Sequence, residues 1–221
     1  MLPFSTDQFL DVFRQYNQAI WPLQIVAYVL GLVAIGLAAT PSRSSHQIIS
    51  AILAGFWLWM GIVYHILFFR TINPAALGFG ALFLVQALGW LFFGLVRPRL
   101  TFALDATPYT AAGLVMIVYA MLIYPLIGAW LGHGYPQSPS FGVAPCPTTI
   151  FTFGLLLCTS ARVPRTLLII PALWALIGFA AALTLGIRED IGLLLAAGVA
   201  VPLLLWRDRT AAQAGGRQRY A

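Results

Sequence analysis

The sequence predicts an all-α integral membrane protein: a bundle of about seven transmembrane helices with an amphipathic interfacial helix at its N-terminus. Of the 221 residues, 61% are hydrophobic and only 8% are charged, whereas a soluble domain carries about a quarter charged residues. The apolar residues gather into runs of roughly 20, the length that crosses a bilayer as a helix. Because hydrocarbon offers no partner for backbone N–H and C=O groups, such runs must be helical.

The N-terminal segment, residues 1–20, is predicted to form an amphipathic helix on the membrane surface. Ser5 can cap this helix, and aromatic side chains share one of its faces. The alternative is a long lead-in to the first span. A secretory signal is not expected, because Asp7 and Asp11 stand where such a peptide carries positive charge.

Seven apolar segments within residues 21–206 are expected to form one transmembrane bundle. Short loops rich in proline, glycine, serine or asparagine separate them. The predicted spans are Trp21–Ala38, Gln47–Phe69, Ala75–Val96, Tyr109–Leu131, Pro145–Ala161, Arg165–Gly186 and Asp190–Trp206. Residues 207–221 are predicted to form a disordered, basic, cytoplasmic tail.

The arginines predict the orientation, because loops rich in arginine and lysine stay in the cytoplasm. The chain has no lysine, and seven spans would place three arginines on the N-terminal side and nine on the other. We therefore expect a multi-pass protein of the cell inner membrane, with its N-terminus outside and its C-terminus in the cytoplasm. Its expected partner is the lipid bilayer. This topology accounts for the net charge of +6 without a nucleic acid.

The fifth span is the least regular element of this topology. Its 17 residues, Pro145–Ala161, make a helix about 25 Å long, and it opens on Pro145-Cys146-Pro147. A re-entrant half-helix is the alternative. Both termini would then be cytoplasmic, with eight arginines on their side of the membrane and four on the other.

Polar residues gather at the predicted outer face of the bundle. His65 lies near the outer end of the second span, His133 follows the fourth, and Cys146 opens the fifth. Ionisable groups are costly in a membrane bundle, so they are candidates for function; the alternative for each histidine is a hydrogen-bonded structural role. Residues expected to support this site are Tyr64, Arg70, Asn73, Tyr135, Thr148, Thr149 and Asp190.

Cys146 lies in the most distinctive segment of the chain, between two prolines. Because proline at the first helical position needs no N–H, we expect Cys146 to act as the N-cap of the fifth span. A thiol near imidazoles suits a soft metal ion, and the helix N-terminus also suits an anion. The alternative is a structural turn in which cysteine serves as a small hydrophobic residue.

Four blocks of the sequence resemble a bacterial membrane family that is classified only as a domain of unknown function. The resemblance covers nearly the whole chain, and its proline-cysteine-proline block is specific. It implies a bacterial membrane setting but no activity or substrate. The blocks are Tyr64-His65, Ile72-Asn73-Pro74-Ala75, Gly132-His133-Gly134-Tyr135-Pro136 and residues 141–154, FGVAPCPTTIFTFG.

Three functions are compatible with the sequence, which contains no nucleotide-binding loop, zinc-protease helix or serine-triad elbow. The first is a small transporter or binder of a soft metal ion or small ligand at an outward-facing site of His65, His133 and Cys146. The second is a membrane-embedded redox or thiol-dependent enzyme, with Cys146 as nucleophile or the histidines as haem ligands. The third is an accessory subunit that binds other membrane protein subunits.

Overall fold

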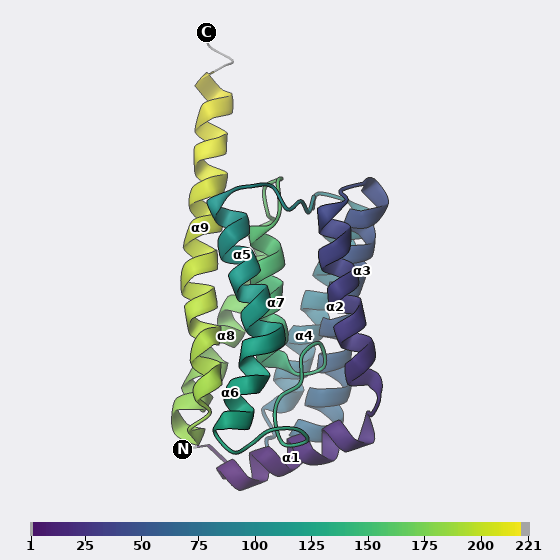
Figure 1. Ribbon diagram of the computed structural model, residues 1–221, viewed down its shortest axis with the longest axis vertical. Helices are drawn as coiled ribbons and strands as arrows, with labels where there is room; N and C mark the ends of the chain where they lie inside the picture. Colours follow the sequence, from purple (N-terminus) through teal and green to yellow (C-terminus); the bar gives the residue numbers. More distant parts are fainter. Residues whose placement is uncertain (1, 218–221) are drawn as a thin grey trace.

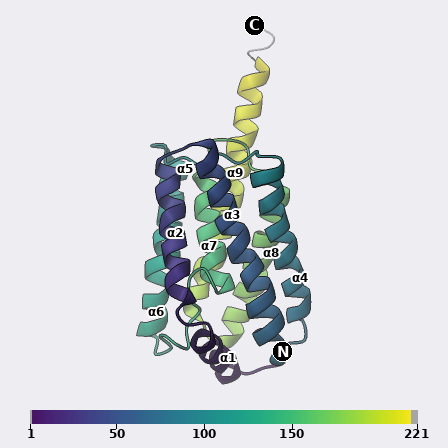
Figure 2. The ribbon, with the colours of Figure 1, turned by 90° about the vertical axis from the view of Figure 1, so that its right-hand side faces the viewer.

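The computed structural model describes residues 2–217, and every regular element in this range is a helix. Most helices run side by side along one axis, whereas α1 lies across one end and α9 projects beyond the other (Figures 1 and 2). The α-helices are α1 Thr6–Ala19, α2 Leu23–Ala39, α3 Arg43–Trp59, α4 Ala76–Leu91, α5 Pro108–Val118, α6 Tyr124–Trp130, α7 Pro145–Leu157, α8 Thr166–Leu185 and α9 Ile191–Arg217. Shorter π and 3-10 turns are η1 Met60–Phe68, η2 Phe69–Thr71, η3 Phe92–Val96, η4 Tyr119–Ile123 and η5 Arg188–Asp190.

The predicted all-α bundle is confirmed, with several helices apolar enough to cross a membrane. Within the described range, the runs that meet this condition are Arg43–Thr71, Ala76–Val96, Pro108–Trp130, Thr166–Leu185 and Arg188–Ala212. The pair α1 and α2 is bent by 84° at its junction and supplies a further candidate. The predicted fifth span corresponds to α7, which is apolar but shorter than the others.

The segment predicted to form an amphipathic surface helix is helical over Thr6–Ala19, as α1. Ser5 caps it in a capping box: its hydroxyl accepts from Gln8 N at 3.3 Å, and Gln8 Oε1 accepts from Ser5 N at 2.8 Å. Phe9 and Phe13 on one face are buried against the bundle. On the opposite face Arg14 donates a hydrogen bond to Asp11, which lowers the pKa of that carboxyl group.

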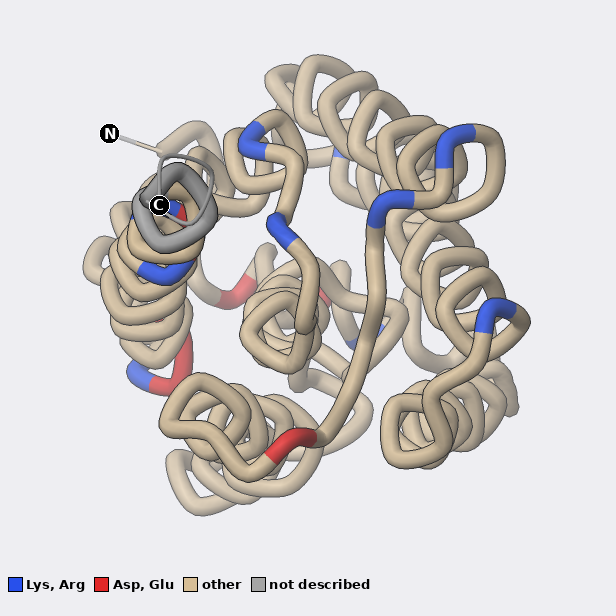
Figure 3. Tube along the Cα trace, turned by 90° about the horizontal axis from the view of Figure 1, so that it is seen from above, with Lys and Arg blue, Asp and Glu red and all other residues tan. Residues whose placement is uncertain are grey.

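The two ends of the bundle differ in charge. The end crossed by α1, called the α1 end, also holds residues 69–75, 131–138 and 185–190, which hydrogen-bond to α1 or share a cavity with it. The opposite end, called the arginine end, joins residues 38–46, 97–107 and 158–162 through hydrogen bonds. Basic residues gather at the arginine end (Figure 3). They include Arg43, Arg97, Arg99, Arg162, Arg165 and Arg207.

Helix α7 forms the centre of the bundle, and all of its residues are buried. Just before it, the carbonyl oxygen of Val143 accepts a hydrogen bond from Tyr16 of α1 at 2.7 Å. Just after it, the carbonyl oxygen of Cys158 accepts from Ala103 N at 2.7 Å. Helix α7 therefore connects the α1 end with the arginine end, enclosed by neighbours that include α5, α8 and α9.

The predicted disordered tail, residues 207–221, is helical as far as Arg217 because α9 continues without a break. Alanine, glutamine and arginine favour helix here. Tertiary contacts also hold its first residue, since Arg207 donates to the carbonyl oxygens of Thr159 and Ala161. Arg219 lies outside the described residues.

Candidate functional site

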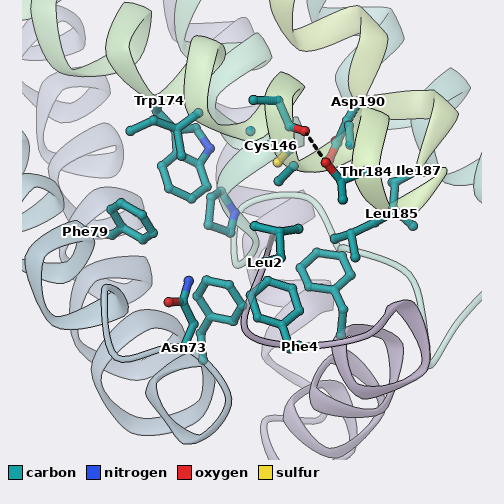
Figure 4. Close-up of a pocket in the computed structure, with 18 of the residues that line it drawn as sticks. Leu2, Phe4, Asn73, Phe79, Cys146, Trp174, Thr184, Leu185, Ile187 and Asp190 are labelled. Atoms are coloured by element: carbon teal, nitrogen blue, oxygen red, sulfur yellow. Dashed lines mark hydrogen bonds between the residues drawn. The ribbon is translucent and has the colours of Figure 1, made fainter.

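A cavity of about 420 Å³ lies where α1 crosses the end of the bundle (Figure 4). The N-terminal segment and α1 form one wall, and η1, α8 and η5 form others. This volume falls within the range of about 300–1,000 Å³ that holds small organic ligands in proteins. The aromatic side chains that line it are Phe4, Phe9, Phe13, Tyr64, Phe69, Phe79 and Trp174.

A few polar groups face this largely apolar cavity. The Cys146 thiol lies near the Asp190 carboxyl group and the Trp174 indole. Trp174 is only 8% exposed, and its Nε1 has no hydrogen-bond partner within residues 2–217. Asn73 Oδ1 accepts from Ala75 N, and its amide nitrogen points to the side of the cavity that holds Phe79 and Trp174 (Figure 4). The cavity thus offers N–H donors beside a thiol and a carboxyl group.

The start of α7 determines where Cys146 points. Ala144 is the N-cap and Pro145 the first helical residue, so the prediction that Cys146 caps the helix is wrong by two positions. The turn closes through Thr148, whose hydroxyl accepts from Gly142 N and donates to the carbonyl oxygen of Ala144. Cys146 therefore faces α8, where a Cβ added at Gly178 would lie 3.6 Å from its sulfur.

Comparison with known families places the chain in one of them. The model of a family described as "Family of unknown function (DUF6064)" matches residues 6–214. The chain belongs to this family. The match confirms the resemblance drawn from the four sequence blocks. No curated protein and no solved structure matches the chain.

His65 is fully buried in this DUF6064 protein but does not line the cavity. Its ring packs against Phe83 and Trp174, with ring centroids 4.6 and 5.1 Å apart respectively. Neither ring nitrogen has a hydrogen-bond partner in the described part of the chain. Trp174 therefore contacts His65 and also lines the cavity.

His133 follows α6 and contacts a different neighbour. Its Nε2 lies 2.8 Å from Glu189 Oε1, and Glu189 directly precedes Asp190 of the cavity wall. His65 thus contacts Trp174, His133 contacts Glu189, and Cys146 faces Asp190, so the three residues have different neighbours. Residues 2–217 contain no group of three or more His, Cys, Asp or Glu side chains placed to hold a metal ion.

The residues predicted to support the site fall into two groups. Tyr64, Asn73 and Asp190 line the cavity. Four others lie elsewhere: Arg70 and Tyr135 are exposed, Thr148 closes the α7 turn, and Thr149 is buried with an unpaired hydroxyl among the described residues. Sequence reasoning did not select Glu189 or Trp174. Glu189 could have been found from its position next to Asp190 at the boundary of an apolar segment. Trp174 could have been found from Gly178, which lies one helical turn later on the same face of α8.

Proposed function

We propose that this protein binds a small amphipathic ligand in the cavity at the α1 end, with the polar head of the ligand held beside Trp174, Cys146 and Asp190. The observation that carries this proposal is the unpartnered, buried indole N–H of Trp174 on the wall of an aromatic cavity. A buried donor without an acceptor costs about 1–3 kcal/mol. A ligand carbonyl or hydroxyl oxygen would remove this cost, while the aromatic walls favour an apolar or planar body.

A membrane setting supports a ligand of this kind. Leucine and valine side chains on separate helices expose more than half of their surface, with Leu32 at 61%, Val115 at 67% and Leu195 at 63%. Apolar surface of this extent is unfavourable in water and suits lipid. A ligand that partitions into the bilayer can reach the cavity without crossing water.

Binding of a small ligand is favoured over binding of a soft metal ion. The cavity is lined by one thiol and one carboxyl group, and neither His65 nor His133 lines it. Soft metals prefer several sulfur or imidazole ligands. Cys146 on the cavity wall also favours a second candidate, a thiol-dependent enzyme acting on the bound ligand. If the protein binds a small ligand as proposed, it could also transport that ligand across the membrane, and this remains a hypothesis.

We infer an inner-membrane topology of seven crossings with the N-terminus outside. The arginine end carries most of the arginines, and Arg14, Arg70 and Arg188 belong to the α1 end, a bias that supports a cytoplasmic arginine end. The course of α7 from one end to the other supports counting it as a crossing. Its 13 residues extend about 20 Å, and the mostly buried segment 138–144 precedes it.

This topology predicts the behaviour of two reporter fusions. A phosphatase that is active only outside the cytoplasm should be active when fused after Pro74, at the α1 end. A fluorescent protein that folds only in the cytoplasm should fluoresce when fused to the C-terminus. Cytoplasmic location of both reporters would contradict the proposal and support the re-entrant alternative with both termini inside.

Filling the cavity should abolish ligand retention. In Ala181→Phe a ring would enter the space that Ala181 lines on α8, and overpacking of about 2 kcal/mol corresponds to about a thirtyfold loss of affinity. The matched control is Ala172→Phe, on the same helix but away from the cavity. Each protein is purified in native lipid discs. The small amphiphilic molecules that co-purify with it are then extracted and identified by mass spectrometry.

We expect a compound enriched with the wild type and with Ala172→Phe, and lost with Ala181→Phe. Equal amounts in all three proteins, or no enriched compound in the wild type, would contradict ligand binding in the cavity. A compound that leaves a covalent adduct on Cys146 would favour the enzyme candidate.

A further inference from the structure

Two adjacent acidic residues, Glu189 and Asp190 of η5, are buried inside the bundle. Their exposed fractions are 0% and 3%. Removing an ionised carboxylate from water costs several kcal/mol unless a cation or several hydrogen bonds compensate. The charge state of this pair therefore depends on the groups that face it.

The groups around the pair supply a single potential cation. Glu189 Oε1 lies 2.8 Å from His133 Nε2, and this is the only ion-pair contact of either acid within residues 2–217. Glu189 Oε2 is buried with no hydrogen-bond partner in the same range. Asp190 Oδ1 accepts a hydrogen bond from the Tyr124 hydroxyl at 2.5 Å. Arg188 in the same turn is exposed.

The other titratable groups near the pair are neutral or become negative when they ionise. Cys146 of α7 faces Asp190, and Tyr64 of η1 belongs to the same cavity wall. Tyr119 of η4 donates its hydroxyl to the backbone carbonyl of Glu189 at 2.7 Å. The imidazole of His133 therefore faces only one of the two carboxyl groups, and ionisation of both acids would leave at least one buried negative charge uncompensated.

We propose that Glu189 and Asp190 form a proton-binding site that holds at least one exchangeable proton at neutral pH and connects the cavity with the α1-end surface through His133. Asp190 lines the cavity at one end of this series. The His133 side chain, 11% exposed, lies at the other end. Gly128 leaves room for the link, because a Cβ there would lie 3.1 Å from Glu189 Oε1. Intramembrane acids in such an arrangement are typical of proton relays.

The proposal is tested by infrared difference spectroscopy of the full-length protein in lipid nanodiscs, with protons and deuterons as the probes. A protonated carboxyl group has a carbonyl band that carboxylates lack and that shifts in heavy water. The wild type should show this band at neutral pH. The changes Glu189→Gln and Asp190→Asn should each reduce it and together remove it. Asp105→Asn, at an exposed carboxyl of the arginine end, should leave it unchanged.

His133→Ala tests the connection to the surface. We expect the band to persist while its shift in heavy water slows by about a hundredfold or more, the contribution typical of a positioned proton-transfer group. Absence of the band in the wild type, which needs no variant, would overturn the proposal. Persistence of the band in folded Glu189→Gln with Asp190→Asn would overturn it as well. An unchanged exchange rate in His133→Ala would overturn the proposed route.

Discussion

Replacing Gly154 with valine is expected to cause a large loss of stability. Helices α5 and α7 cross backbone to backbone at Gly113 and Gly154. A Cβ at Gly154 would lie 2.7 Å from the carbonyl oxygen of Gly113 and 2.7 Å from Ile117 Cγ1. The backbone contact cannot be relieved by turning a side chain, so the helices must separate.

We expect Gly154→Val to lower the free energy of unfolding by about 3 kcal/mol or more, the upper range for overpacking. Unfolding by sodium dodecyl sulfate in mixed micelles measures this change. Gly36→Val is the matched control, because nothing lies within 4 Å of a Cβ at that position of α2. Equal unfolding midpoints for the two variants would contradict the close crossing of α5 and α7.

Replacing Asn17 with leucine is expected to release α1 from the bundle. Asn17 is fully buried, and its Nδ2 donates to the carbonyl oxygens of Pro136 and Ser138 at 2.7 and 2.8 Å. Its Oδ1 accepts from Ser140 at 3.1 Å. Leucine would leave these groups buried and unpaired, at about 1–3 kcal/mol for each, so a loss of about 3 kcal/mol is expected in the same unfolding assay.

The same change should open the cavity, because α1 forms one of its walls. We expect N-ethylmaleimide to modify Cys146 faster in Asn17→Leu than in the wild type, while the buried Cys158 at the other end of α7 is unaffected. Gln18→Leu, at an exposed position of the same helix, is the control. If Asn17→Leu and Gln18→Leu match the wild type in both stability and labelling, Asn17 does not anchor α1.

Interactions between residues close together in the sequence determined where the helices of this protein form and how α1 begins. Apolar runs without charge must be helical in hydrocarbon, and Ser5 followed by Gln8 is a capping box that depends on neighbouring residues alone. The position of His65 also follows from local evidence, because Ala54 and Gly61 lie on its stripe of the helix and small residues favour close approach of a neighbouring helix. His65 is buried as that stripe indicates.

Only the tertiary structure decided which residues form the pocket and the buried acid pair. Protein interior and lipid are both apolar, so hydropathy does not reveal which face of a helix packs on which neighbour. The hydropathy of α7 therefore gives no sign that this helix is buried on every side. The contacts of Tyr124 with Asp190 and of His133 with Glu189 join residues 66 and 56 positions apart. Such pairs form only because α6 and η5 meet at the α1 end, which no local pattern encodes.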